Sequence, residues 1–245
     1  MGHYVALVAE RCVNEDECEA RCLLMLAIFD LEGVLVDGEF LPELAKLKGI
    51  EDKIWDITMK GIRGEINWEE GLYLRIQELK GLSYSDCVKV SNSLRLMPGA
   101  KEACKTLREM GFMLASVSGG FTLLAERIQR EVGLDYFFAN ELVFVGDRLD
   151  SVVIRVNSNK ANSIHGLVKT LKEPREQIVA VVDGANDLTL FELAELKIAF
   201  CAQPIVESRA DVVIKEKDLR LIIPAIKKYI KNLEDNGVKI RRYKH

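Results

Sequence analysis

The hydrophobic pattern of the chain alternates between short continuous apolar runs and amphipathic stretches. Apolar runs at 24–29, 112–117 and 178–182 are typical of strands that are buried on both faces of a parallel sheet. Shorter strands are expected at 198–200 and 212–214, and helical patterns lie between the strands. Because strands joined by helical crossovers form parallel sheets, the pattern predicts an α/β fold with a doubly wound, mainly parallel sheet.

Residues 39–96 interrupt this alternation with amphipathic helices only. Apolar side chains recur there at spacings of three and four residues, as at Leu41, Leu44, Leu47, Ile54 and Ile57. A further helix opens at 66–68, and a fourth is expected at 83–93 with Ser83 as its N-cap. Since no buried-strand pattern occurs in this stretch, we expect a small helical domain inserted into the α/β core.

The rest of the chain returns to the α/β pattern. Helices are expected at 122–132, 159–171 and 188–194, followed by a last helix that ends near residue 230 and has Pro224 in its first turn or at a kink. An alternating stretch at 142–154 predicts a β-hairpin that projects from the core. The division that follows is an N-terminal appendage of unknown role at 1–22, a core at 23–38 and 97–233, the inserted domain at 39–96 and a basic tail at 234–245.

Composition and charge exclude several classes of partner. The 245 residues carry a net charge of −4 with a pI near 5.6, so neither nucleic acid nor a membrane surface is an expected partner. The apolar run at 23–29 is far shorter than the about 20 residues of a membrane span, and the sequence before it lacks a signal-peptide pattern. We therefore expect a cytoplasmic protein whose basic C-terminal residues form a solvated tail.

The six cysteines fit a reducing compartment, where thiols stay free. Cys12, Cys18 and Cys22 cluster in the first segment, but they form no CxxC pair. A zinc or iron–sulfur site in this segment is therefore disfavoured against inert thiols or a disulfide.

Acidic residues directly follow two of the predicted buried strands. Asp30 ends the first strand, with Glu32 two residues later. Asp183 ends the strand at 178–182, with Asp187 close behind. Ligands of doubly wound folds bind beyond the carboxyl ends of the strands, so these side chains are expected to converge on one crevice. Crowded carboxylates are costly unless a cation lies among them, and oxygen ligands suit Mg²⁺, so the sequence predicts a magnesium site.

Groups able to hold a phosphate are expected at the same crevice. The strand at 112–117 ends in the sequence SGG, and Lys160 begins a predicted helix. Ser118, the Gly119 amide at a helix N-terminus and the Lys160 ammonium would bind phosphate oxygens. The metal site and these groups together indicate a phosphate ester as the substrate.

The residue types also indicate a reaction. A carboxylate beside a metal ion can attack phosphorus and form an acyl phosphate, and Asp30 is the candidate. Glu32 can protonate the departing alkoxide and later deprotonate the attacking water. A single aspartate after a strand, or a single SGG, is more often an ordinary turn. Three such strand ends in one α/β chain, with a lysine at a helix start, favour phosphate chemistry over coincidence.

These residues fall in four short motifs. The motifs are FDLEGVLVD at 29–37, VSGGF at 117–121, Lys160, and VDGAND at 182–187. Together they resemble the motifs of the haloacid dehalogenase superfamily and, within it, of the phosphoserine phosphatases. The segments at 133–140 and 197–202 resemble the phosphoserine phosphatases as well, and the similarity covers residues 24–230.

The resemblance implies a Rossmann-like core with a four-helix cap inserted after the first motif. It implies Asp30 as the nucleophile and a Mg²⁺ held by Asp30, the backbone carbonyl of Glu32 and Asp183. We expect Asp187 to hold or orient the same ion. The resemblance also implies a set of residues around the substrate phosphate: Ser118, Gly119, Lys160 and Asn186. In this scheme Lys160 also stabilises the aspartyl phosphate.

The resemblance further implies a small-molecule substrate, phosphoserine, whose hydrolysis belongs to serine biosynthesis. The family's glutamate that meets the serine ammonium matches Glu39, and its arginine that meets the serine carboxylate matches Arg75. Ile62 and Trp68 would supply an apolar lid. Without the family match, Glu39 and Arg75 would indicate only a solvated helix face.

Two positions depart from the family pattern. The acid/base residue is usually Asp, whereas Glu32 is one methylene longer, and Gly33 is expected to let the loop absorb the extra reach. The DLEG sequence resembles that of a related bacterial enzyme that can pass the phosphoryl group of phosphoserine to homoserine, so phosphotransfer stays open. Val182 stands where the family usually has Gly, and we expect a small shift in packing without loss of the metal.

Two other functions stay open at this point. One is a phosphatase or phosphotransferase for another small phosphate monoester, and the other is a catalytically weak phosphate-binding regulator. A homodimer is also compatible with the sequence, which does not define the oligomeric state.

Overall fold

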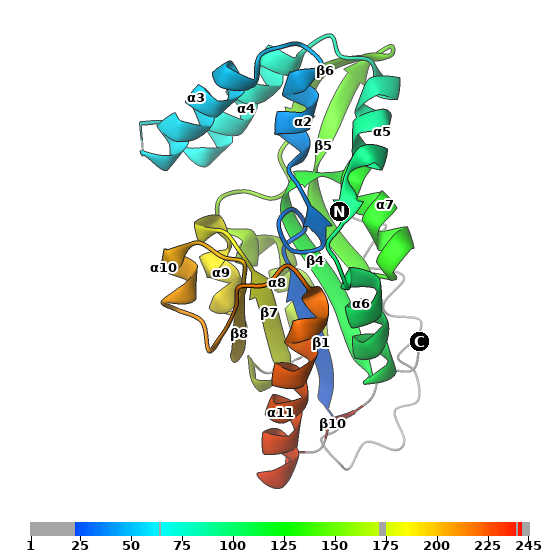
Figure 1. Cartoon of the computed structure of the whole chain (residues 1–245), viewed down its shortest axis with the longest axis vertical. Coiled ribbons are helices and arrows are strands. Elements are labelled where there is room, and N and C mark those ends of the chain that lie inside the picture. Colours follow the sequence, from blue (N-terminus) through cyan, green and yellow to red (C-terminus); the bar gives the residue numbers. More distant parts are fainter. Residues whose placement is uncertain (1–22, 64, 172–174, 239, 242–245) are drawn as a thin grey trace.

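The computed structural model describes residues 23–63, 65–171, 175–238 and 240–241. At its centre lies a sheet with the strand order β6-β5-β4-β1-β7-β8-β9, in which every neighbouring pair except β5 and β6 is parallel (Figure 1). The strands are β1 Leu23–Phe29, β4 Phe112–Phe121, β5 Tyr136–Val145, β6 Arg148–Val153, β7 Ile178–Val182, β8 Leu196–Phe200 and β9 Val212–Ile214. The predicted doubly wound, mainly parallel sheet is confirmed.

Helices cover both faces of this sheet. They are α6 Ala100–Glu109, α7 Thr122–Val132, α8 Lys160–Leu171, α9 Leu188–Phe191, α10 Pro204–Glu207 and α11 Ile222–Asp235, with short 3₁₀ turns at Arg175–Gln177, Ala185–Asp187 and Leu219–Leu221. Met25, Ala27 and Phe29 of β1 belong to one apolar cluster, together with residues of α6, α7 and α11. Leu26 and Ile28 belong to the other, with residues of α8, α9 and α10. The continuous apolar run of β1 is thus explained by burial of both its faces.

Four helices make up most of the segment inserted between β1 and β4. They are α2 Phe40–Lys46, α3 Glu51–Ile62, α4 Trp68–Leu79 and α5 Tyr84–Ser93. The side chains of Asn67 and Ser83 cap the last two helices, accepting hydrogen bonds from backbone N–H groups at 2.7 and 3.1 Å. Figure 1 shows these helices above the carboxyl end of the sheet, so the predicted helical insertion is confirmed.

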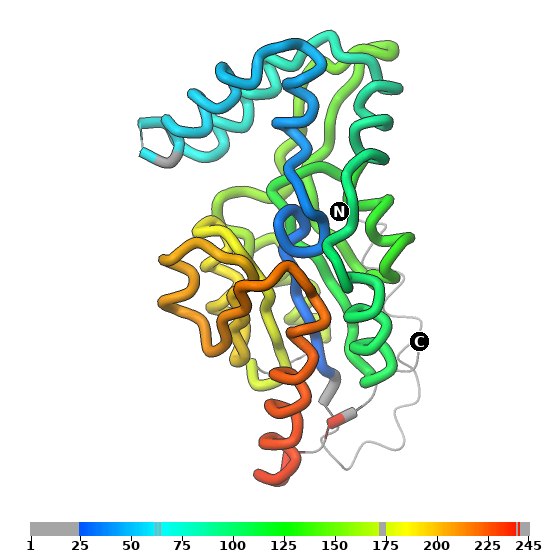
Figure 2. Tube along the Cα trace, in the orientation of Figure 1, coloured from blue at the N-terminus to red at the C-terminus, as the bar shows by residue number. Residues whose placement is uncertain are grey.

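Two short strands connect the inserted helices to the core. β2 (Val36–Asp37) pairs antiparallel with β3 (Arg95–Leu96). Figure 2 traces the chain as it leaves the core through β2 and comes back through β3. Because the two connections lie side by side, we propose that residues 39–96 act as a cap domain on a core made of 23–38 and 97–233.

The hairpin of β5 and β6 links the core to the cap a second time. β5 starts at Tyr136, where it pairs with β4, so the hairpin predicted at 142–154 is the far end of a core strand. Beyond the sheet the hairpin pairs with the loop between α4 and α5. Gly81 N–H donates to the Leu149 carbonyl, and Leu149 N–H donates to the Leu82 carbonyl, both at 2.8 Å. The hairpin therefore holds the cap as well as projecting from the core.

The two ends of the chain differ from the prediction in part. The appendage at 1–22, with its three cysteines, and the last residues of the tail lie outside the described residues. α11 continues to Asp235, past residue 230, because Leu233 still packs against the core. β10 (Ile240–Arg241) pairs in parallel with the start of β1, and Ile240 packs on the core, so this part of the tail is not simply solvated. No helix in the described ranges is long and apolar enough to span a membrane.

Candidate active site

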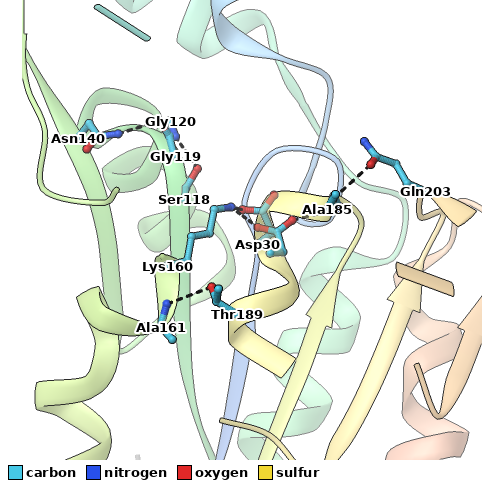
Figure 3. A network of polar contacts seen from close by, with 12 residues as sticks. Asp30, Ser118, Gly119, Gly120, Asn140, Lys160, Ala161, Ala185, Thr189 and Gln203 are labelled. Atoms are coloured by element: carbon cyan, nitrogen blue, oxygen red, sulfur yellow. Dashed lines mark hydrogen bonds and ion pairs between the residues drawn. The ribbon is translucent and has the colours of Figure 1, made fainter. Parts of the chain in front are cut away.

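The strand order places the candidate residues at one point of the sheet. β1 lies between β4 and β7, so the segments that follow these three strands are neighbours (Figure 3). Asp30 follows β1, and its backbone N–H donates to the Val181 carbonyl of β7 at 3.1 Å. Ser118 lies in the last part of β4, Asp183 follows β7, and Lys160 is the first residue of α8. The convergence of these residues that the sequence predicted is therefore a result of this strand order.

Three aspartates form an acidic cluster, which consists of Asp30, Asp183 and Asp187. One carboxylate oxygen of each lies within 4.8 Å of the other two. Burial raises the pKa of Asp183 to about 8 and that of Asp187 to about 7, and the charge of Asp30 adds to both effects. The charge of Asp30 thus disfavours ionisation of Asp183 and Asp187 unless a cation lies among them.

Lys160 is the cation that the chain itself supplies to the acidic cluster. Its side chain is almost fully buried, and its Nζ donates to Asp30 Oδ1 at 2.7 Å and pairs with Asp187 Oδ1. Burial alone would lower the pKa of Lys160, but the charges of Asp30 and Asp187 outweigh it and the pKa is raised. Lys160 is therefore a fixed ammonium that touches the proposed nucleophile.

The acidic cluster fits a divalent cation. With all three buried or partly buried carboxylates ionised, Lys160 offsets only one of their charges, and a divalent cation would neutralise the other two. Gly33, with φ +87°, packs so closely on Asp183 that a Cβ there would lie 2.1 Å from Asp183 Oδ2. An all-oxygen set of this kind suits Mg²⁺.

The loops that carry the cluster are held by polar groups that the sequence analysis did not identify. Gln203 N–H donates to the Asp183 carbonyl at 2.9 Å, and Gln203 Oε1 accepts from Ala185 N–H at 3.3 Å. Thr189 Oγ1 accepts from Ala161 N–H at 3.4 Å, next to Lys160 (Figure 3). No pattern in the sequence indicated either residue, because each acts on a loop far from it along the chain.

The SGG turn, defined as residues 118–120, is an irregular end of β4. Ser118 is buried, and its Oγ accepts the Gly120 N–H at 2.9 Å. The pairing of β4 with β5 shifts register between Val117 and Phe121, and α7 begins only at Thr122. Gly119 is thus in extended backbone rather than at a helix N-terminus as predicted, because pairing with β5 continues past the turn.

Asn140 fastens the SGG turn to the segment that leads to Lys160. Its fully buried amide donates from Nδ2 to the Gly119 carbonyl at 2.8 Å (Figure 3). Its Oδ1 accepts the backbone N–H groups of Arg155 and Val156 at 2.8 and 2.9 Å. Asn140 was not among the predicted site residues, although a polar residue directly after the apolar residues 136–139 is a signal of a buried polar contact.

Glu32 faces the cap. Its Oε2 accepts the N–H of Phe40, the first residue of α2, at 3.4 Å. Burial raises the pKa of Glu32 well above its ordinary value, the charge and hydrogen bond of Glu39 and the charge of Asp30 raise it further, and the Phe40 bond opposes this only partly. A carboxyl with this pKa can carry a proton to a leaving group.

The extra methylene of Glu32 is accommodated by the SGG turn. A Cβ on Gly120 would lie 2.5 Å from Glu32 Oε1, so the glycine leaves room for the longer side chain. Gly33, which was expected to absorb the reach, instead packs on Asp183. Val182, the second departure from the family pattern, is fully buried among apolar side chains on the α8 side of the sheet.

The cap brings Arg75 and Glu39 close to Glu32. Arg75 of α4 is half-buried and donates from Nε to the Gly71 carbonyl at 3.1 Å. Burial lowers the pKa of Arg75, while the charges of Glu39 and Glu32 raise it. A cation and two carboxyl groups therefore lie together where the cap meets the core.

The remaining predicted residues lie around the same site. Trp68 covers the SGG turn, since a Cβ on Gly119 would lie 2.8 Å from Trp68 Cζ2. Asn186 is exposed, and its Oδ1 folds against Gly184. The side chain of Ile62, the other predicted lid residue, is outside the described part of the structure.

This arrangement agrees with the proteins that the chain resembles. Residues 24–195 match the family model of haloacid dehalogenase-like hydrolases. The phosphoserine phosphatase of Methanocaldococcus jannaschii is 37% identical over 206 residues, which cover 82% of this chain and 97% of that protein. The phosphoserine phosphatase of Campylobacter jejuni subsp. doylei is 34% identical over 207 residues, covering 83% of this chain and all of that protein.

Two solved structures of phosphoserine phosphatases also superpose on this chain. A phospho-aspartyl intermediate analogue of phosphoserine phosphatase superposes with a TM-score of 0.78 at 36% identity, covering 83% of this chain and 99% of that one. A substrate-bound phosphoserine phosphatase superposes with a TM-score of 0.77, also at 36% identity, covering 82% of this chain and 98% of that one. The chain belongs to the phosphoserine phosphatase family of the haloacid dehalogenase superfamily.

Proposed function

We propose that this protein is a Mg²⁺-dependent phosphatase that hydrolyses O-phosphoserine to serine and phosphate through an aspartyl phosphate on Asp30. The observation that carries the proposal is the position of Asp30. It is buried beneath the cap, bonded to the Lys160 ammonium and grouped with Asp183 and Asp187. Relatives with more than a third of their residues identical are phosphoserine phosphatases, which supports the choice of substrate.

The reaction has two steps on the chain's own groups. An oxygen of Asp30 forms a bond to phosphorus while the bond from phosphorus to the serine oxygen breaks, and Glu32 gives that oxygen a proton. A water then attacks phosphorus, Glu32 takes its proton, and the bond between Asp30 and phosphorus breaks to release phosphate. The same carboxyl thus serves as acid and then as base, so both steps leave Glu32 and Asp30 as they began.

One positive charge and several hydrogen-bond donors would surround the phosphoryl oxygens in this scheme. Lys160 supplies its ammonium beside Asp30, and Ser118 and the Gly119 amide supply hydrogen-bond donors. Asn186 would bind at the outer side of the phosphate. Mg²⁺, held by the acidic cluster and the Glu32 backbone carbonyl, would neutralise charge on the transferred group.

The cap supplies recognition of the amino acid. Arg75 would bind the serine carboxylate and Glu39 its ammonium, and their electrostatic interaction with each other and with Glu32 supports this assignment. Trp68 would close the apolar side of the pocket over the SGG turn. A substrate without both charged ends would leave one of these groups unpaired.

The test is phosphate release from O-phosphoserine against O-phosphothreonine, glycerol 3-phosphate, glucose 6-phosphate and p-nitrophenyl phosphate, each with and without Mg²⁺. We expect the highest kcat/KM for phosphoserine and no turnover after chelation of the metal. A higher kcat/KM for another ester would identify that ester, in place of phosphoserine, as the substrate. Absence of Mg²⁺-dependent release from every ester would leave the protein as a phosphate-binding regulator.

A second candidate function rests on Glu32. The longer acid/base side chain lies over Gly120, where it changes the space open to an attacking group. Phosphoryl transfer to an alcohol in place of water is therefore proposed as the alternative. Homoserine added to the phosphoserine reaction tests it, because phosphohomoserine forms only if the acceptor competes with water.

Arg75→Ala is expected to lower kcat/KM for phosphoserine by about 10- to 150-fold, which corresponds to loss of one or two charge-assisted hydrogen bonds. The same variant should change kcat/KM for p-nitrophenyl phosphate little, because that ester has no carboxylate. Arg75→Lys keeps the charge without the planar fork and should recover part of the loss. Equal losses for both esters would contradict a role for Arg75 in binding an amino acid.

A further inference from the structure

Glu69 belongs to the cap but makes its hydrogen bonds to the core. It lies in the first turn of α4, and its Oε1 accepts both the N–H and the Oγ–H of Ser158, at 2.9 and 3.0 Å. These hydrogen bonds lower the pKa of Glu69, so the carboxylate is ionised. Ser158 stands two residues before Lys160, in the segment that delivers the ammonium to Asp30.

The preceding residue of α4 touches the opposite side of the site. Trp68 lies against Gly119 of the SGG turn, at a distance that leaves no room for a Cβ. Two consecutive residues of α4 therefore contact the two core segments that flank Asp30. The first turn of α4 therefore contacts the core on both sides of Asp30.

Other parts of the cap are tied to the core away from this turn. Arg127 of α7 donates to the Leu94 carbonyl at the end of α5 at 2.7 Å, and Ser91 Oγ donates to the Leu123 carbonyl at 3.3 Å. The far end of α4 is followed by the loop that pairs with the hairpin, at Gly81. These hydrogen bonds hold α5 and the end of α4 to the core, so the first turn of α4 is a separate point of attachment of the cap.

We propose that Glu69 is a positioning residue. Its hydrogen bonds to Ser158, called the latch below, hold the first turn of α4 against the core and keep Trp68 over the SGG turn. These hydrogen bonds break to admit phosphoserine and to release serine, and this role rests on the proposed function. The contact between the first turn of α4 and the core does not depend on that function. Glu69 is half-buried and Ser158 exposed, so water can replace their hydrogen bonds. A contact of this kind suits a lid that opens and closes in each turnover.

Tryptophan fluorescence reports the latch without any turnover. The chain has two tryptophans, and Trp55→Phe removes the one that is 63% exposed, so that the signal comes from Trp68 alone. In this background Glu69→Ala, which removes the acceptor of both hydrogen bonds, is expected to raise the acrylamide quenching constant of Trp68 about twofold. Ser158→Ala removes only the Oγ–H donor and should raise the constant less, and the double variant should exceed Glu69→Ala by little because both changes act on one contact.

Glu70→Ala is the matched control. It makes the same chemical change one residue along α4, on an exposed side chain, and should leave the quenching constant at the value of the Trp55→Phe parent. An unchanged constant in Glu69→Ala, or an equal rise in Glu70→Ala, would overturn the latch. Because phosphoserine is not used, this outcome is independent of whether the protein hydrolyses phosphoserine.

Discussion

Asp30→Asn is expected to abolish phosphate release from phosphoserine, by a factor on the order of 10⁴ or more, while the protein still folds. The amide of Asn cannot form the acyl phosphate, so the reaction loses its covalent step. The substitution keeps the shape of the side chain and removes one negative charge from beside Asp183 and Asp187, so the fold is not expected to suffer. Phosphate release and circular-dichroism melting, measured on one preparation, check both parts.

Asp37→Asn is the matched control for this experiment. Asp37 lies in the same motif, but its exposed carboxylate pairs with Lys217 on the surface. We expect this variant to retain at least half of the parental kcat. Undiminished activity in Asp30→Asn would exclude Asp30 as the nucleophile, and equal losses in both variants would show that the motif acts through folding alone.

Lys160→Met is expected to lower both turnover and stability. The change removes the ammonium from between Asp30 and Asp187, which stay buried without it. Breaking a buried pair by removal of one partner costs about 3–5 kcal/mol in the free energy of unfolding. Loss of a fixed charge at the phosphoryl oxygens lowers kcat on the order of 10²- to 10³-fold.

Urea denaturation with and without Mg²⁺ separates the two roles of Lys160. A bound cation replaces part of the missing positive charge, so Mg²⁺ should raise the midpoint of unfolding more in Lys160→Met than in the parent protein. Lys217→Met, which removes an exposed lysine, should leave the midpoint unchanged. A parental midpoint in metal-free Lys160→Met would contradict the role of Lys160 as counter-charge to the acidic cluster.

The local hydrophobic pattern was sufficient to predict the strands that are buried on both faces. β1 and β7 are continuous apolar runs, and the central place of both in the sheet explains why no polar side chain interrupts them. Ser83 was expected to cap α5, and its hydroxyl accepts the Asp86 N–H as the local spacing requires. Only the far part of β5 was predicted as a strand, because the polar residues Asn140 and Glu141 interrupt the apolar sequence between Tyr136 and Val145.

Sequence by itself determined the doubly wound sheet, the helical insertion and the positions of Asp30, Lys160 and Asp183 at the ends of their elements. These features follow from side-chain periodicity, which is set within a few residues. Only the tertiary structure decided that Gly120 makes room for Glu32, that Asn140 holds the SGG turn and that Glu69 reaches Ser158. Each of these contacts joins residues that are 21 or more positions apart, so its geometry depends on how the cap, the hairpin and the sheet pack together.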